Sequence, residues 1–225
     1  MNSPVEKILV KNSVATGVKL ESGEVIEADI VVSNADLHHT ETQLLPAESR
    51  MYTDAYFESR TMAPSGYILY LGLSKKLEKA VHHGLLFDQN WDRGFEEIFD
   101  DPRWPDHPSL YYCAPSVTDP SVAPAGKEAL FILVPVASGL ECSKETLSKF
   151  RNKILTLLSE HFGENLEDLI EFEREFTVKD FEERYNSYKG TALGFAHTLF
   201  QTATFRPNNI HKKVSNLFFV GAQTN

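Results

Sequence analysis

The sequence predicts an α+β fold, in which a mixed, mainly antiparallel sheet is flanked by helices. Short β-branched and alternating apolar runs recur along the chain between Gly, Pro, Asn and Ser turns, as in strands joined by tight connections. One long amphipathic pattern, residues 143–163, predicts a helix packed over a sheet. The 225 residues are 42% hydrophobic, enough for one large domain or for one domain plus part of another.

The first 36 residues predict a small antiparallel β unit that feeds a buried strand. The apolar runs are Ile8–Val10, Ala15–Leu20, Val25–Ile26 and Ile30–Val32, with turn chemistry at Asn12 and at Glu21–Glu24.

The rest of the chain alternates predicted helices and strands. The expected strands are 65–73, 85–87, 110–114, 129–134, 170–178 and 217–220, and the first of these is the clearest candidate for a central strand. The expected helices are 37–45, 50–60, 143–163 and a short one from 177 to about 185. Ser143 is the expected N-cap of the long helix and Gly163 its stop.

Composition excludes several classes of function. The net charge of -10 and a pI near 5.3 argue against nucleic-acid binding, which needs a basic face. Residues 1–5 lack the pattern of a signal peptide, and the longest apolar run, 129–137, is shorter than the roughly 20 residues of a membrane span. Cys113 and Cys142 are expected to be buried small hydrophobes in a reducing compartment.

We predict no metal site. The adjacent pairs His38–His39 and His82–His83 should point in different directions on a strand or helix, and no cysteine or carboxylate stands at ligand spacing. Nor does the pattern identify a catalytic acid, base or nucleophile.

The last stretch, 215–225, is the segment that most clearly indicates a ligand-binding site. A β-favouring run, Leu217–Val220, ends on Gly221–Ala222, so a buried strand leads to a point where only small residues fit. Such an ending usually meets a ligand, and the stretch 190–195, rich in Gly and Ala, is a second place where backbone can approach one.

Four segments together resemble the carotenoid desaturase family of flavoproteins, of the phytoene desaturase type. They are Gly17–Asp36; the dense run from Ser65–Gly66 through His82–His83, Pro108–Ser109 and Pro115–Gly126 to Val134–Pro135; Leu199–Pro207; and Ser215–Asn225. The resemblance covers essentially the whole chain. It implies an interior piece of a larger enzyme, without the N-terminal dinucleotide-binding motif or the C-terminal end, and inactive alone.

The resemblance also implies a division of the chain and a set of site residues. Residues 1–36 are expected to be part of an FAD-binding domain, 37–205 the substrate-binding domain, and 206–225 the start of the C-terminal FAD segment. Expected FAD contacts are Ser33, Asn34, Ala35, Asp36, Arg206, Pro207, Gly221, Ala222 and Thr224. Arg206 either stabilises charge near the flavin or fixes a carboxylate, or forms a surface ion pair at a turn.

The expected activity is desaturation of phytoene or a shorter C30 analogue, an apolar polyene. A substrate tunnel needs aromatic side chains, and an ordinary core uses the same residues. The chain supplies Tyr67, Tyr70, Phe87, Tyr111, Tyr112, Phe131, Phe195, Phe200 and Phe205, of which Tyr67, Tyr70, Phe195, Phe200 and Phe205 are the expected substrate contacts. A carotenoid isomerase, a polyene oxidase or saturase, or a non-catalytic module for apolar ligands stays open. The resemblance implies a cytoplasmic protein with peripheral contact on the inner face of the membrane, and leaves the oligomeric state open.

Overall fold

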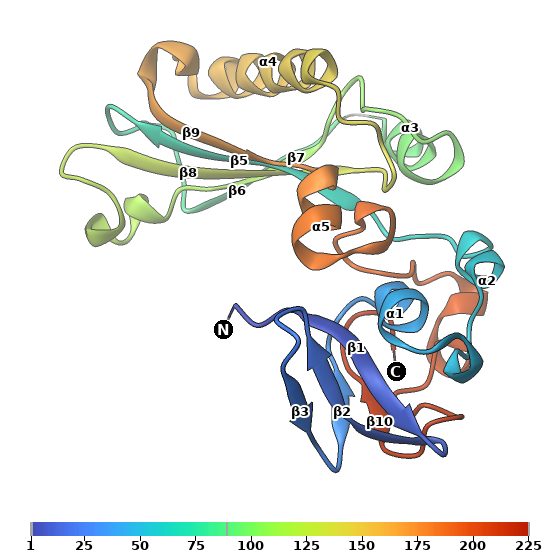
Figure 1. Cartoon of the computed structure of the whole chain (residues 1–225). Coiled ribbons are helices and arrows are strands. Elements are labelled where there is room, and N and C mark those ends of the chain that lie inside the picture. The colour runs from blue at the N-terminus through green and yellow to red at the C-terminus, as the bar shows by residue number, and fades with distance from the viewer. Residues whose placement is uncertain (1, 89, 225) are drawn as a thin grey trace. The chain divides into compact units, whose positions relative to one another are not determined.

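The computed structural model describes residues 2–88 and 90–224, which divide into two compact units (Figure 1). Unit 1 combines Met1–Ala63 with Glu182–Asn225, and unit 2 is the continuous segment Pro64–Phe181. The predicted α+β class is confirmed, because helices and mainly antiparallel sheets build both units.

The boundaries expected at residues 36 and 205 do not coincide with these units. Segments 37–63 and 182–205 belong to the same compact unit as both ends of the chain. Met62 forms an isolated antiparallel bridge with Phe195, and the Thr191 hydroxyl donates to the Ala63 carbonyl at 2.9 Å. The assignment of separate regions to cofactor and to substrate stays a prediction.

Unit 1 contains a three-stranded antiparallel sheet and a separate parallel pair of strands. Its elements are β1 (Val5–Lys11), β2 (Val14–Leu20), β3 (Val25–Glu27), β4 (Val31–Ser33), α1 (Leu37–His39), α2 (Asp54–Glu58) and β10 (Leu217–Phe219). The β1–β2 hairpin turns on Asn12 and Ser13, both in the left-handed region that such turns need. The expected helix at 37–45 is α1 followed by a π-helical turn, Thr40–Leu44.

Unit 2 is built on a five-stranded antiparallel sheet of order β6-β7-β8-β5-β9. Its elements are β5 (Ser65–Leu73), β6 (His83–Leu86), α3 (Trp91–Phe95), β7 (Leu110–Cys113), β8 (Glu128–Val136), α4 (Lys144–Phe162) and β9 (Ile170–Phe176); a π-helical turn, Glu96–Asp100, follows α3. The helix α5 (Val178–Tyr185) crosses the boundary between the units. Short 3-10 turns occur at 47–49, 115–117, 120–122, 166–169, 188–190, 199–201 and 203–205.

Helix α4 covers one face of the unit 2 sheet (Figure 1), and its ends follow the predicted capping. The Ser143 hydroxyl accepts from the Thr146 N–H at 3.2 Å, and Gly163 ends the helix in the left-handed conformation with φ of 74°. Its apolar stripe, including Ile154 and Leu158, packs against inward residues of β5 and β8. None of the helices in the described part of the chain combines the length and the hydropathy needed to span a bilayer.

Strict alternation in β8 shows that the sheet has a core face and an outer face. Residues 128, 130, 132, 134 and 136 are buried and their neighbours are partly exposed. The antiparallel register places Tyr67 opposite Val134 on the core side and Tyr70 opposite Phe131 on the outer side. The predicted central strand β5 is therefore paired on both edges, yet Tyr70 is 40% exposed.

Candidate functional site

The candidate site forms where β4 and β10 end side by side. The two strands pair in parallel, Val31 to Leu217 and Ser33 to Phe219, and the Val220 N–H donates to the Ser33 carbonyl at 3.0 Å. The carboxyl ends of parallel strands meet at one edge of a sheet, which is where α/β proteins bind ligands. The pairing thus brings together two segments that the sequence predicted to contact the cofactor.

A cavity of about 210 Å³ opens at this edge. Pockets that enclose a drug-sized ligand span about 300–1,000 Å³, so this cavity holds only part of a molecule as large as FAD. It is lined by Asn34, Ala35, Asp36, Leu37, Tyr185, Ser187, Thr191, Ala192, Gly194, Phe219, Val220, Gly221, Ala222, Gln223 and Thr224. Six of the predicted cofactor residues line it, and Ser33 lies one residue before the rim.

Small residues and open main-chain donors make this edge suited to a cofactor. Gly221 has φ of +124°, and a β-carbon there would come within 3.3 Å of the Asn34 side-chain oxygen. Among the described residues, the N–H groups of Gly221 and Ala222 have no hydrogen-bond partner. Backbone donors that face a cavity can hold a flavin ring or a phosphate oxygen. The donor set and the small side chains therefore fit a flavin cofactor.

A network centred on Asp36 and Gln223 joins the two segments. Asp36 caps α1 by accepting from the His39 N–H, and it also accepts from the Tyr188 N–H at 3.1 Å and the Gln223 side-chain amide at 2.8 Å. The Gln223 side-chain oxygen, Oε1, accepts from the Leu37 N–H at 2.6 Å. Because the Asp36 carboxylate accepts hydrogen bonds from three other residues, it holds the walls of the cavity in position as well as lining the cavity.

The segment 190–195 also lines the cavity, through Thr191, Ala192 and Gly194. The Thr191 hydroxyl accepts from the Gly194 N–H at 3.1 Å and donates to the Ala63 carbonyl. A β-carbon on Gly194 would lie only 2.5 Å from the Gln223 side chain, so the wall packs directly on the Asp36 network.

Arg206 and Pro207 are buried and do not line the cavity. The Arg206 guanidinium donates to the Gln201 carbonyl at 3.1 Å, the Phe195 carbonyl at 3.2 Å and the Ala222 carbonyl. The surface ion pair that we considered is therefore wrong for Arg206. Burial lowers the pKa of the Arg206 guanidinium from its ordinary value, and charge-assisted bonds to three carbonyls hold Ala222 against the 195–201 segment.

Behind β10, a buried histidine fixes the chain that leads into the site. His211 Nδ1 accepts from the N–H groups of Lys213 and Val214 at 3.1 and 2.9 Å, so the ring proton sits on Nε2. Nε2 faces the buried Glu41 carboxylate at 3.7 Å. Burial, with a smaller effect of Lys213, lowers the pKa of His211 to about 4 and keeps it neutral. Burial also raises the pKa of Glu41, whose other oxygen accepts from the Met51 N–H at 2.8 Å.

Four of the five expected substrate residues form a buried pair and an exposed pair. Tyr67 and Phe195 are fully buried in the cores of unit 2 and unit 1 respectively. Tyr67 packs on Trp104 and Phe150 and donates its hydroxyl to Glu175, so its role is packing. Phe200 and Phe205 are exposed and contact each other with ring centroids 5.8 Å apart.

Tyr70 belongs to an aromatic row on the outer face of the unit 2 sheet. Its ring lies 5.4 Å from Phe131, which in turn lies 6.1 Å from Tyr111. The row crosses β5, β8 and β7, and Ile68 and Leu133 are paired next to it on the same face. The aromatic row ends beside a cation, because Arg174 on β9 is paired with Tyr70 on this face, whereas the core face lies under α4.

Sequence reasoning missed Gln223, Ser187 and Tyr185 as cavity residues. Gln223 lies within the stretch 215–225, between two predicted contacts. Its position directly after a Gly-Ala pair was the available signal. Ser187 and Tyr185 carry no such signal, because only the tertiary fold brings 185–187 to the ends of β4 and β10.

Comparison with known proteins identifies the family of the chain. The profile of the flavin containing amine oxidoreductase family matches residues 1–225, and the chain belongs to this family. The fold is similar to that of a solved oxidoreductase from Methanosarcina mazei, with a TM-score of 0.56 and 19% identity, over 98% of this chain and 43% of the other.

Among curated proteins, the chain is similar to several carotenoid desaturases. It is 46% identical to a carotenoid 3,4-desaturase from Haloarcula japonica over 92% of this chain, and 39% identical to a zeta-carotene-forming phytoene desaturase from Myxococcus xanthus over 99% of it. A phytoene desaturase from Neurospora crassa is 35% identical over 100% of the chain. The chain spans only 42%, 43% and 40% of these three proteins.

Proposed function

We propose that this chain is part of an FAD-dependent oxidoreductase that desaturates an apolar polyene in carotenoid biosynthesis. The observation that carries the proposal is the parallel β4–β10 pair, whose carboxyl ends open on a cavity lined in part by Gly221 and Ala222, and the N–H groups of these two residues have no partner among the described residues. Similarity to proteins named phytoene and carotenoid desaturases supports the reaction class.

The residues of this chain hold and orient the cofactor. The Gly221 and Ala222 N–H groups are placed to bind flavin oxygen or nitrogen acceptors, Asp36 and Gln223 fix the two strand ends, and Arg206 braces Ala222 from behind. The chemistry that FAD supplies when bound is two-electron oxidation, in which a C–C single bond of the substrate loses two hydrogens and becomes a double bond.

The outer face of the unit 2 sheet is the proposed wall for the polyene. The aromatic rings of Tyr111, Phe131 and Tyr70 form a continuous row that strand pairing holds in place. A flat conjugated chain gains about 25 cal/mol per Å² of apolar surface that it buries, so the aromatic row can bind it through apolar contact, with Arg174 at the β9 edge of the row. Of the expected substrate residues, Tyr70 is the one on this face.

The test is an anaerobic absorption experiment on the full-length enzyme with added FAD and phytoene in liposomes. We expect the flavin bands to bleach while bands of a longer conjugated polyene grow. Replacing Tyr70 with Ser should raise KM for the polyene, whereas Phe200→Ser, at an exposed aromatic elsewhere, should not. Flavin binding without a more conjugated product would favour an isomerase or saturase, and absence of flavin binding would reject the enzyme.

A carotenoid that is already conjugated should be offered beside phytoene. The name of the Haloarcula japonica relative indicates a reaction at the 3,4-position of a carotenoid. Faster flavin reduction by a conjugated substrate than by phytoene would place the reaction late in the synthesis of the polyene, and the reverse would place it at the start.

We further propose peripheral contact with a membrane through an aromatic row around α3. Phe87, Trp91, Phe95 and Phe99 recur every four residues, and the first three are more than half exposed. Acidic neighbours such as Asp92 and Glu96 disfavour anionic lipid, so the aromatic rings would carry the binding at the level of the headgroups. This contact would occur on the cytoplasmic side.

Flotation with neutral phosphatidylcholine vesicles tests this contact. We expect the wild-type enzyme to float, with a blue shift of Trp fluorescence, and the double variant Trp91→Ser/Phe95→Ser to stay unbound. Phe172→Ser, at an equally exposed aromatic outside the row, is the control. Equal flotation of the double variant and of the control would reject the row as the membrane contact.

A further inference from the structure

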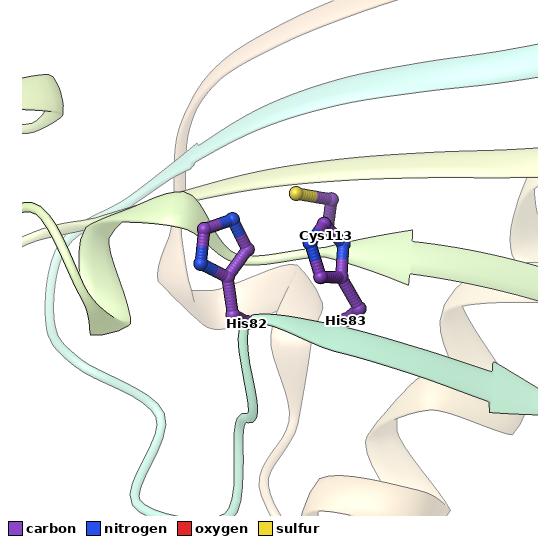
Figure 2. Close-up of side chains that lie close together, drawn as sticks. All are labelled: His82, His83 and Cys113. Atoms are coloured by element: carbon purple, nitrogen blue, oxygen red, sulfur yellow. The ribbon is translucent and has the colours of Figure 1, made fainter.

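Three potential metal ligands meet where β6 begins (Figure 2). A nitrogen of His82, a nitrogen of His83 and the sulfur of Cys113 all lie within 4.8 Å of one another. His83 and Cys113 are cross-strand partners in the β6–β7 pair, and the His82 carbonyl accepts from the Ala114 N–H at 2.9 Å. Backbone pairing therefore fixes the positions from which all three side chains project.

The expectation that the two histidines diverge is wrong for this pair. His82 lies at a bend just before the strand, so the alternation of a regular strand does not apply to it. Its ring stacks on that of His83, with centroids 4.2 Å apart and planes 26° from parallel. Two imidazoles are thus presented on one side of the strand pair, beside the thiol.

Hydroxyl groups orient both rings. His82 Nδ1 lies 2.6 Å from the Thr118 hydroxyl, and His83 Nδ1 lies 2.7 Å from the Tyr111 hydroxyl. Each histidine therefore has one nitrogen in a hydrogen bond and its Nε2 available. Histidines that bind metals use their two nitrogens in the same way: one nitrogen binds the metal, and a hydrogen bond from the other fixes the orientation and the tautomer of the ring.

We propose that His82, His83 and Cys113 form a binding site for a borderline-soft divalent metal ion, with Zn²⁺ as its best match. Two imidazole nitrogens and one thiolate are ligands that Zn²⁺ prefers and that Mg²⁺ and Ca²⁺ do not. Three protein ligands leave a fourth tetrahedral position for water. His83 is exposed and the other two are partly exposed, so an ion enters directly from solvent.

The ion would join the edge strand to its neighbour. β6 has β7 as its only partner in the described sheet, and its register covers just four residue pairs, from His83–Cys113 to Leu86–Leu110. A metal held by the start of β6 and the end of β7 closes that end of the pair. The site belongs to unit 2 alone and does not depend on the proposed reaction.

Metal titration of the full chain tests the proposal. The protein is freed of metal under reducing conditions and titrated with Zn²⁺ against a chromophoric chelator, and in parallel with Co²⁺. We expect one equivalent of each metal to bind, a thiolate-to-cobalt charge-transfer band in the near ultraviolet, and a higher melting temperature with Zn²⁺ but not with Mg²⁺.

Matched variants separate this site from incidental binding. Cys113→Ser should abolish the charge-transfer band, and Cys142→Ser, at the other free cysteine, should leave it unchanged. His82→Asn should weaken Zn²⁺ by more than about 100-fold, and His107→Asn should have no effect. Thr118→Val, which removes the hydrogen bond that orients His82 and a longer one to the Pro115 carbonyl, should weaken Zn²⁺ by about 10- to 100-fold while keeping one equivalent bound.

Two results would overturn the site. One is equal Zn²⁺ affinity for the wild-type chain and for the triple variant His82→Asn/His83→Asn/Cys113→Ser, with far-ultraviolet circular dichroism showing both folded. The other is a charge-transfer band that survives Cys113→Ser and disappears in Cys142→Ser.

Discussion

His211 should make the stability of unit 1 depend on pH, in a direction that its surroundings determine. Its pKa is about 4 in the folded chain against 6.5 for an ordinary histidine. Between these values the unfolded chain binds a proton that the folded chain does not, so stability falls as pH falls. Each unit of pKa difference corresponds to about 1.36 kcal/mol, so the 1.5 units between 6.5 and pH 5 predict a loss of about 2 kcal/mol from pH 7 to pH 5.

The substitution His211→Asn isolates this contribution. The Asn side-chain oxygen can accept from the Lys213 and Val214 N–H groups in place of Nδ1, and an amide does not titrate. Glu41 acts in the opposite sense. Because its pKa is raised in the folded chain, the folded chain binds a proton at a higher pH than the unfolded chain does, so the contribution of Glu41 to stability grows as pH falls. Glu41→Gln should therefore steepen the loss of stability, and His211→Asn should reduce it.

The assay must report on unit 1 alone. Both tryptophans, Trp91 and Trp104, lie in unit 2, so their fluorescence does not report on the unfolding of unit 1. Hydrogen exchange of the Phe219 and Val220 amides, which donate to Asn209 and Ser33, measures its opening directly. Equal losses of opening free energy between pH 7 and pH 5 in the wild-type chain and in His211→Asn would refute the assignment of the proton.

Three further substitutions test the site and the cores. Gly221→Ala puts a β-carbon against Asn34 at a strained φ and should weaken FAD binding to the full-length enzyme by about tenfold, measured by quenching of flavin fluorescence. Arg206→Lys keeps at most one of three carbonyl bonds and should lower the opening free energy of unit 1 by about 2 kcal/mol in hydrogen exchange. Lys76→Met leaves the fully buried Glu128 carboxylate without its cation at 3.5 Å and should destabilise unit 2 by about 3 kcal/mol, measured by Trp fluorescence in urea.

Gly221→Ala and Lys76→Met each have a matched control in the chain. Gly94→Ala adds the same methyl group where nothing lies within 4 Å; it should leave FAD binding unchanged and stabilise α3 by about 0.5–1 kcal/mol. Lys75→Met breaks the ion pair with the partly exposed Glu164 and should cost less than about 1 kcal/mol. If Lys75→Met and Lys76→Met have equal effects, burial of the carboxylate does not decide the cost.

The fold was largely predictable where a local signal sets the structure. Ser143 and Gly163 end α4 as caps because their hydrogen bond and backbone conformation are properties of single residues. The strand at Ser65–Leu73 was predicted with its observed bounds. The sequence did not predict which face of the sheet each side chain of this strand occupies. Tyr67 and Tyr70 stand in a run that is apolar throughout, and only the register with β8 puts Tyr67 in the core and Tyr70 outside.

The candidate site was predictable in part, since small residues after a strand indicate a close approach wherever they occur. Its supports were not, because Asp36 and Gln223 are separated by most of the chain and become partners only through the parallel pairing of β4 and β10. Arg206 illustrates the same limit. A turn with an arginine suggests an exposed ion pair, yet three carbonyl groups, which lie 5, 11 and 16 residues away in the sequence, converge on this buried guanidinium.

The His82–His83 pair shows why a periodicity rule fails at the end of an element. Alternation of side chains holds between residues that share one regular conformation, and here the strand begins at His83. At the bend before it, His82 is free to place its ring on that of His83, and the bond to Thr118 holds it there. Adjacent ligands are therefore excluded as a metal site only when both lie inside one helix or strand. The start of an edge strand, with a cysteine across the ladder, is where that exclusion does not apply.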